Sequence, residues 1–349
     1  MPTPTAIDLS QQFRQRLAKQ EADAAERIGR IYARIYRAAL DEINGLADYI
    51  AALDEIDRKA LTDLGRLQRL LRQIEEQASR FGVTVESEVA NIRAVSLQQG
   101  ADDAIALIEA SLPPLPQPLI REIAGSFSRL PVDAIEQAAG LFDNQSPLAV
   151  KLQDSYGQFV REQVEVHLLD GIALGKNPRT IAAILQRNLQ DALGTGLRSA
   201  LTTIRTAQIK SYQLANHATY ADNGNIVPQW RWWAKLDDRT CLSCLNQHGT
   251  LHPITEVLND HHNGRCAPIP ETISYKALGI NLPDPRPEVI SGEEWFDQQP
   301  HKTQLAMMGP GKLEAYNAGK FRFEDLSRPY QDEVYGELLR EATLKELVR

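Results

Sequence analysis

The sequence has few cysteines, no long apolar run and no excess of basic charge. Only 3 of its 349 residues are cysteines, an odd number that cannot form a complete disulfide framework. No stretch reaches the ~18 apolar residues of a membrane-spanning helix, and residues 1–10 lack the pattern of a secretory leader. With 38 basic and 46 acidic side chains, the formal net charge of -8 disfavours a chain-wide grip on nucleic acid. These absences favour a protein made and kept in a cytoplasm, without a membrane partner.

Proline is missing from the N-terminal third, which permits long helices there. None of the 19 prolines falls between Pro4 and Pro113, and apolar residues recur in this interval at steps of three and four. One such series comprises Ile28, Ile31, Ile35, Ala39, Ile43, Leu46, Ile50 and Leu53, and another comprises Leu61, Leu64, Leu67, Leu71, Ile74 and Ala78. Gly82 is expected to end the second helix, before a further helix over 89–112. Residues 1–112 are therefore predicted to form a long helical arm or bundle.

The arm ends where prolines return. The segment 112–118, LPPLPQP, contains four prolines and predicts a linker or sharp corner. Further along, Asn177 as a cap and Pro178 at the first helical position predict a helix start, and another helix is expected over 198–220.

An aromatic strand is predicted after these helices. The run IVPQWRWWAKL alternates so that Trp230, Trp232 and Ala234 share one face. These tryptophans could stack on bases, but their position favours a role in the core of a small module. Asp237 and Asp238 then predict a turn.

Arginines form a stripe on the first predicted helix. Arg27, Arg30, Arg34 and Arg37 are spaced by three and four residues. Such a stripe can meet phosphates or an acidic protein surface. The nearby acidic residues Asp23, Glu26, Asp41 and Glu42 favour instead a solvated face whose charges pair with one another.

The chemistry of the sequence is concentrated in residues 237–270, DDRTCLSCLNQHGTLHPITEVLNDHHNGRCAPIP. This segment holds every cysteine and four of the seven histidines. A CxxC turn lets two thiolates converge on one ion, and a distant His/Cys pair completes a tetrahedral shell. The predicted ligands of a structural zinc ion are Cys241, Cys244, His261 and Cys266. Three other histidines are alternatives, His262 in place of His261 and, more weakly, His248 or His252. The alternative without metal is a set of reduced cysteines beside solvent-facing histidines.

Enzymatic interpretations of this cluster are weaker. A zinc deaminase needs HxE before its PCxxC, whereas His217 is followed by Ala218 and Thr219, and Thr240 stands at the proline position. An HNH-like metal-dependent nuclease is a closer alternative, because the CxxC precedes histidines and Asn263. The second CxxC of many such folds is missing.

The cluster resembles that of the phage head morphogenesis family, the Mu F-like minor head proteins. The shared motifs are an aromatic strand leading into D-x-R-T-C-x-x-C, here WRWWAKLDDRTCLSC, a short hairpin, here CLNQHGTLHPI, and a closing segment, here DHHNGRC. The preceding helices, with ALTTIRTAQIKSYQLAN, and the tail, with MMGPGKLEAYNAGK, are similar too, so the resemblance extends over residues 160–349. Gly264 and Gln208 depart from the family pattern of cysteine and glutamate.

The resemblance implies a low-copy component of the virion that associates with the portal and other capsid components. It would assist capsid assembly and DNA packaging or delivery, with packaged DNA as a further candidate partner, and it implies neither an enzymatic activity nor a small-molecule substrate. The expected fold is mainly α with a small α+β module, in four parts. These are the helical arm 1–112, a connector with short helices 113–160, a Mu F-like module with a zinc knuckle 161–290 and a helical tail 291–349.

Overall fold

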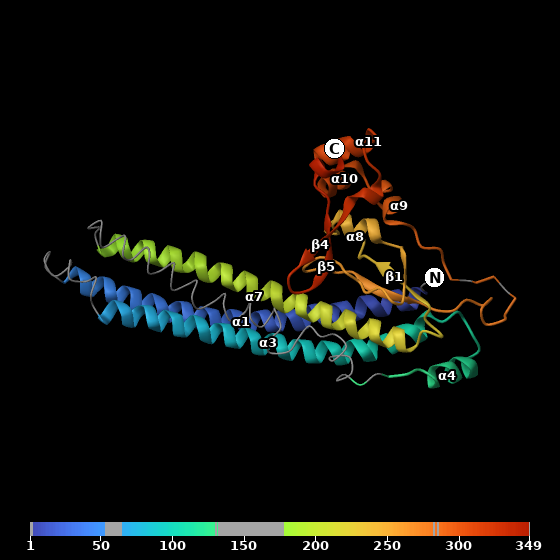
Figure 1. Ribbon diagram of the computed structural model, residues 1–349, viewed down its shortest axis with the longest axis horizontal. Coiled ribbons are helices and arrows are strands. Elements are labelled where there is room, and N and C mark those ends of the chain that lie inside the picture. Colours follow the sequence, from blue (N-terminus) through green and yellow to red (C-terminus); the bar gives the residue numbers. More distant parts are fainter. Residues whose placement is uncertain are drawn as a thin grey trace. The chain divides into compact units, whose positions relative to one another are not determined.

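The computed structural model describes residues 3–52, 65–129, 131, 178–281, 283–284 and 286–348. This part of the chain is mainly helical and contains two small antiparallel sheets (Figure 1). The chain divides into two compact units. Unit 1 comprises residues 1–18, 93–141 and 206–349, and unit 2 comprises residues 19–92 and 142–205. The mainly helical class with a small β component, predicted from the sequence, is confirmed.

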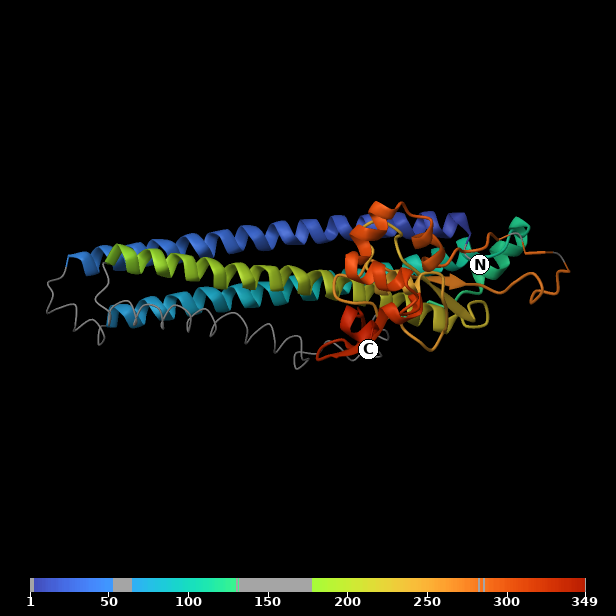
Figure 2. The same ribbon diagram turned by 90° about the horizontal axis from the view of Figure 1, so that it is seen from above.

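Three long helices dominate the described residues. They are α1 (Pro4–Ala51), α3 (Gly65–Ser111) and α7 (Pro178–Asp222). Within each unit, segments of these helices lie side by side (Figures 1 and 2). The predicted apolar stripe of α1 is buried at Ile28, Ile35, Ala39 and Ile43, which confirms its helical periodicity. Leu61 and Leu64 of the second stripe, and residues 132–160 of the predicted connector, lie outside the described residues.

Two predicted helix boundaries are wrong. Gly82 does not end a helix, because α3 runs through it to Ser111. Its neighbours Phe81 and Val85 are buried, and burial of such side chains outweighs the ~1 kcal/mol that a glycine costs inside a helix. Likewise α7 begins at Pro178, as predicted, but continues without a break where a second helix was expected at residue 198. Asn177, the predicted cap, lies outside the described residues.

Polar contacts join the three long helices within unit 1. The Asp103 carboxylate of α3 pairs with Arg16 of α1 and accepts a hydrogen bond from the Tyr212 hydroxyl of α7 at 2.9 Å. Asn216 donates to the carbonyl of Gly100 at 2.7 Å. A Cβ atom at Gly100 would lie 2.6 Å from the Tyr212 carbonyl oxygen, so α3 and α7 are in close backbone contact there.

Two arginines of the predicted stripe on α1 pair with acidic residues of unit 2. Arg27 donates to both carboxylate oxygens of Glu88, each at 2.9 Å, and Arg30 lies 3.3 Å from Glu26. The contact of Arg30 with Glu26 confirms the predicted pairing within the helix face, whereas Arg27 pairs with Glu88 of α3, which was not predicted. Such exposed pairs contribute little to stability.

The predicted aromatic strand is β1 (Gln229–Trp233). It is the middle strand of an antiparallel sheet with the order β2-β1-β3, in which β2 is Leu251–Pro253 and β3 is Ala267–Glu271. Trp230 and Trp232 are buried on one face, with Trp230 opposite His252 on one side and Pro270 on the other. Prolines in β3 lack a donor for strand pairing and are typical of an edge strand.

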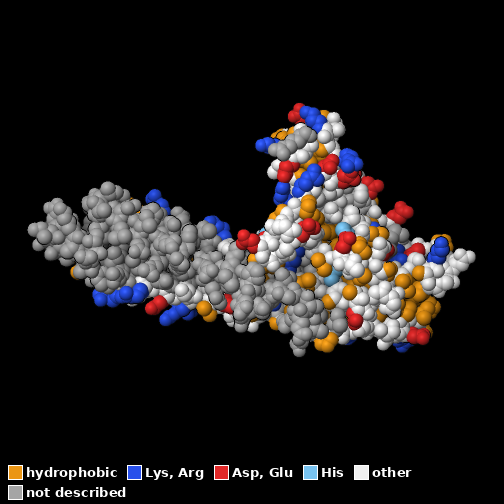
Figure 3. Space-filling model, in the orientation of Figure 1, with side chains coloured by type: hydrophobic (Ala, Val, Ile, Leu, Met, Phe, Trp, Pro, Cys, Tyr) orange, Lys and Arg blue, Asp and Glu red, His pale blue; other side chains and the backbone are white. Residues whose placement is uncertain are grey.

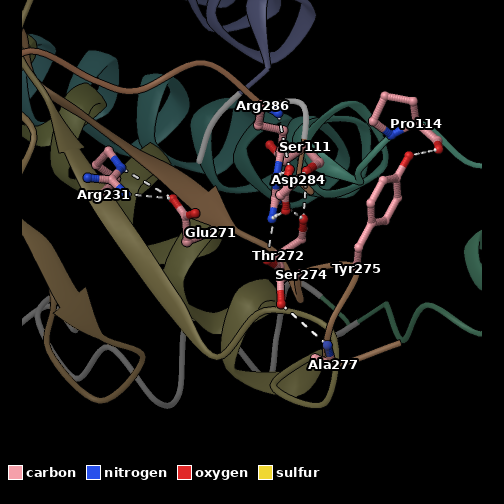
Figure 4. A network of polar contacts seen from close by, with 10 residues as sticks. All are labelled: Ser111, Pro114, Arg231, Glu271, Thr272, Ser274, Tyr275, Ala277, Asp284 and Arg286. Carbon is pink, nitrogen blue, oxygen red and sulfur yellow. Dashed lines mark hydrogen bonds and ion pairs between the residues drawn. The ribbon is translucent and has the colours of Figure 1, made fainter. Parts of the chain in front are cut away.

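A buried polar network ties the end of β3 to the end of α3 (Figure 4). Arg286 donates to the Ser111 carbonyl at 3.2 Å and to the Thr272 hydroxyl oxygen at 2.9 Å, and it pairs with Asp284 at 2.6 Å. Thr272 donates to the same Ser111 carbonyl at 2.6 Å. These donors satisfy a carbonyl left open where the helix ends. The predicted corner at 112–118 follows directly and leads into α4 (Gln117–Gly125).

The C-terminal part is not only helical, as was predicted for 291–349. Its elements are α9 (Gly292–Asp297), α10 (His301–Met308), α11 (Pro310–Asn317), the 3-10 helix η2 (Phe323–Leu326), β4 (Ser327–Asp332), β5 (Gly336–Glu341) and α12 (Leu344–Leu347). The hairpin β4–β5 was missed. Its turn forms because Asp332 accepts hydrogen bonds from the backbone of Val334 and Tyr335, and Gly336 has a φ of 73°.

The surface of this C-terminal part carries charges of both signs. Acidic and basic side chains are interspersed around α10 and α11 on the face shown in Figure 3. Two ion pairs join neighbouring elements there, Lys312 with Glu341 and Arg340 with Glu346. None of the helices that the structure describes is long and apolar enough to span a bilayer.

Candidate metal centre

The CxxC segment forms the start of α8 (Leu242–Gln247). Cys241 caps this helix, and its Sγ accepts a hydrogen bond from the backbone N–H of Cys244 at 3.4 Å. Leu242 and Leu245 anchor the turn in a buried core cluster that includes Phe296. Because residues three apart lie on the same face of a helical turn, the two thiol groups approach each other.

His261 reaches the two cysteines from the loop between β2 and β3. Its Nε2 lies 3.0 Å from Cys241 Sγ, and its Nδ1 lies 2.7 Å from the backbone oxygen of His262. Donation from Nδ1 to this carbonyl leaves Nε2 as the nitrogen that faces the sulfur atoms. The ligand atoms of Cys241, Cys244 and His261 all lie within 4.8 Å of one another. The structure therefore brings together three of the four predicted ligands.

Cys266, the fourth predicted ligand, lies next to this group. It immediately precedes β3, is buried, and shares a core cluster with Cys244, Trp230 and Trp232. The pKa of Cys244 is raised by its hydrogen bond with the Cys241 thiol and, next in order, by that with the Cys266 thiol. Cys266 is therefore adjacent to Cys244, but its Sγ is not among the ligand atoms that all lie within 4.8 Å of one another.

The protonation of the three grouped side chains is coupled. Hydrogen bonding from the Cys244 thiol, assisted by His261, lowers the pKa of Cys241 to about 4. The contact with Cys241 raises the pKa of His261 to about 9, and that of Cys244 lies well above its ordinary value. At neutral pH the group thus holds one thiolate, one thiol and one imidazolium. Binding a metal ion would displace these protons.

A salt bridge fixes the two segments that carry the ligands. Arg265 donates two hydrogen bonds of 2.7 Å to the carboxylate of Asp237, which hold the pKa of that carboxyl well below its usual range. Asp237 also accepts from Thr240 and from the backbone of Arg239, which confirms the predicted turn. Arg14 of α1 donates to the Arg265 carbonyl at 2.7 Å. The residues flanking Cys241 and Cys266 are therefore connected to each other.

The other histidines of the segment have different partners. His248 accepts a hydrogen bond from a backbone N–H at 3.1 Å, and His252 stacks on Trp230 with ring centroids 4.4 Å apart. His262 Nε2 lies 2.8 Å from a carboxylate oxygen of Asp332 in β4. Among the described residues, the grouped ligand atoms include none of these three histidines.

The grouped side chains fit a zinc ion by their chemistry and spacing. Thiolate sulfur and imidazole nitrogen are the donors of structural zinc sites, whereas the group holds no carboxylate of the kind that magnesium and calcium prefer. Bonds of 2.0–2.3 Å in a tetrahedron place the ligand atoms about 3.3–3.8 Å apart. The observed spacing, from 3.0 Å up to 4.8 Å, needs only small side-chain adjustments.

Two residues that hold the loop containing His261 were not predicted from the sequence. Lys210 of α7 pairs with Asp260 at 3.0 Å, and Asp332 of β4 contacts His262. These partners are distant in sequence, so no local motif connects them. The one available signal was the recurrence of polar residues along α7 at steps of three and four.

Together, the fold and the site define a mainly helical protein with a small Cys/His module that has the donors of a metal site. Residues 162–269 match the model of the family described as Phage Mu protein F like protein. This segment is a Phage Mu F-like domain, which confirms the resemblance seen in the sequence, and it contains Cys241, Cys244, His261 and Cys266. The tail beyond residue 269 lies outside the matched residues. Neither a search of curated proteins nor one of solved structures gave a match.

Proposed function

We propose that this chain is a minor head protein of a phage, a structural component present in few copies per virion. It associates with the portal and other capsid components and assists head assembly and the packaging or delivery of DNA. The observation that carries this proposal is the match of residues 162–269 to the phage Mu F-like family. The long helices α1, α3 and α7 support it, because they offer extended surfaces suited to contact with other proteins.

The Cys/His group serves in this proposal as a structural zinc centre. Cys241, Cys244, His261 and Cys266 would hold the ion, and coordination would join α8, the loop before β3 and the start of β3. A small module with a limited core gains folding free energy from such a cross-link. A shell filled entirely by protein side chains is typical of a structural rather than a catalytic site.

The contacts of His261 support a structural role over nuclease activity. A general base needs a ring nitrogen that can take a proton from water or substrate. Both ring nitrogens of His261 are engaged, one by Cys241 and one by the His262 carbonyl.

Quantitative mass spectrometry of purified mature particles tests the proposed function. The chain, the portal protein and the major capsid protein are measured in the same sample. A few copies of this chain per particle, comparable with the portal and far below the major capsid protein, are expected. A copy number near that of the major capsid protein, or complete absence from particles and assembly intermediates, would overturn the proposal. DNA cleavage that requires a divalent metal and disappears in His261→Ala, with folding unchanged, would establish the nuclease instead.

A further inference from the structure

One face of α7 carries a polar stripe that is buried against the Cys/His module. Its residues are spaced by three, four and three positions, which places them on one side of the helix. They are Lys210, Gln213, His217 and Tyr220, and each is at most 7% exposed. Buried polar side chains cost free energy unless they are hydrogen-bonded, so their partners show what the stripe does.

Every member of the stripe bonds to the segment 258–268, which contains His261 and Cys266. Lys210 Nζ donates to the carbonyls of Leu258 and Asp260, at 3.3 and 3.2 Å, and to the Asp260 carboxylate at 3.0 Å. Gln213 donates to the Cys266 carbonyl at 3.2 Å. The two remaining contacts are His217 with the Leu258 N–H at 2.9 Å and Tyr220 with the Pro268 carbonyl at 3.2 Å.

We propose that Lys210 and Gln213 are positioning residues for the metal centre, because they fix the backbone at the two ends of the segment from His261 to Cys266. Lys210 holds the residue directly before His261, and Gln213 holds Cys266 itself. Neither side chain is among the grouped ligand atoms. Their effect on metal binding is therefore exerted through the loop, and this inference rests on the proposed zinc centre.

The buried charge of the Lys210–Asp260 pair supports this role. Asp260 is fully buried and Lys210 is 7% exposed. Apolar side chains in place of a buried ion pair are often as stable or more so, so stability alone gives little reason for one here. The pair fixes the position of the loop before His261, since three acceptors of that loop converge on the one ammonium group of Lys210.

The loop is also closed tightly around the Asp260 carboxylate. A Cβ atom at Gly264 would lie 1.9 Å from Asp260 Oδ2, so only glycine fits at this point of the turn. The carboxylate thus contacts both the lysine of α7 and the backbone that leads from His261 to Cys266. A shift of Asp260 would move both ligands.

Metal affinity of full-length variants tests the inference. Zn²⁺ affinity is measured by competition with a chromogenic chelator, and the ligand-field absorption of bound Co²⁺ reports the coordination geometry. Lys210→Met and Gln213→Met are expected to bind Zn²⁺ about 10–100-fold more weakly than wild type, with an altered Co²⁺ spectrum. Tyr220→Phe is the matched control. It removes one hydrogen bond from the same stripe to a residue beyond both ligands, and its affinity and spectrum are expected to equal those of wild type.

The outcomes separate this inference from the proposed zinc centre. If wild type binds Zn²⁺ and both methionine variants match it, or if Tyr220→Phe weakens binding as much as they do, the positioning role is wrong and the zinc centre stands. If wild type binds neither ion, the zinc centre and this inference both fail. If Lys210→Met does not fold, as judged by circular dichroism, Gln213→Met decides by the same criterion, because it leaves no unpaired buried charge.

Discussion

Cys244 lies between two other thiol groups, which makes it the most direct single-residue test of the metal centre. Its backbone N–H donates to Cys241, and its thiol contacts both Cys241 and Cys266. Serine keeps the size of the side chain and can donate the same hydrogen bond, but its hydroxyl is not a zinc ligand in such sites. Cys244→Ser is therefore expected to lose the metal while retaining its long helices.

Elemental analysis of purified protein checks this expectation. Wild type is expected to carry about one zinc ion per chain and Cys244→Ser almost none. Ser243→Ala changes one of the two buried residues between Cys241 and Cys244 and removes a 3.6 Å contact to Cys241 Sγ but no ligand atom, so this control should keep the ion. Fully stable wild-type protein without metal would refute the zinc assignment.

His217 gives a second prediction, concerning pH. Burial lowers the pKa of His217 from its ordinary 6.5 to about 3, and its Nε2 accepts a hydrogen bond from the Leu258 N–H. Below pH 6.5 the unfolded chain binds a proton that the folded protein excludes, so stability is full above that pH and falls as the pH is lowered toward 3. The slope approaches about 1.4 kcal/mol per pH unit.

Urea denaturation followed by tryptophan fluorescence at several pH values measures this effect. His217→Gln keeps a hydrogen-bond acceptor but cannot be protonated. The slope of its free energy of unfolding against pH should therefore be smaller than that of wild type, by the contribution of about one proton. Part of the acid sensitivity will remain, because burial also lowers the pKa of His248 to about 4. His301→Gln, at an exposed position, is the control. Identical pH slopes in wild type and His217→Gln would contradict the assignment.

At the level of helices and strands, local patterns predicted most of the elements and few of their ends. The proline-free interval and the buried stripe through Ile28 and Ile43 predicted α1, and alternation around Trp230 predicted β1. Gly82 was misread because tertiary packing overrides the local cost of a helical glycine. The hairpin β4–β5 was missed because its turn depends on side-chain hydrogen bonds of Asp332, which helical composition conceals.

In the candidate site, too, local spacing predicted the residues that lie close in sequence but not the contacts between distant ones. The CxxC spacing and the nearby histidines were sufficient to predict Cys241, Cys244 and His261 as a group. The choice among the histidines depended on backbone direction, which no spacing rule gives. Lys210 was not predicted at all, because its partner Asp260 is 50 positions away and a lysine on a helix is normally solvent-exposed.

The contact between α3 and α7 at Gly100 gives a prediction for a pair of helices. A Cβ atom there would lie 2.6 Å from the Tyr212 carbonyl oxygen and 2.8 Å from the Ala215 Cβ, so the helices would have to separate. Gly100→Ala is expected to destabilise the protein by about 1–3 kcal/mol. Thermal unfolding followed by circular dichroism measures this.

Gly29 provides the matched control, because it also lies inside a long helix. A Cβ atom there would have no described neighbour within 4 Å. Gly29→Ala is therefore expected to raise stability by about 0.5–1 kcal/mol through better helix propensity. If both substitutions stabilise the protein, close packing at Gly100 is wrong.

For the whole molecule, the distribution of tryptophan allows metal removal to be followed in one region. All four tryptophans lie between residues 230 and 295, in unit 1, whereas most of the helical residues that the structure describes belong to α1, α3 and α7. Trp230 and Trp232 share a core cluster with Cys244 and Cys266, so their fluorescence reports the surroundings of the metal centre. The two signals therefore separate the module from the long helices.

Removal of metal with a chelator is expected to lower the urea midpoint seen by tryptophan fluorescence far more than the midpoint seen by circular dichroism. An ion present at 100 times its dissociation constant contributes about 2.7 kcal/mol to the state that binds it, and readdition of Zn²⁺ should restore the fluorescence midpoint. A fluorescence midpoint unchanged by the chelator would refute a structural metal. Equal shifts of both midpoints would show that the module and the long helices unfold as one cooperative structure, because loss of the ion would then destabilise residues far from its ligands.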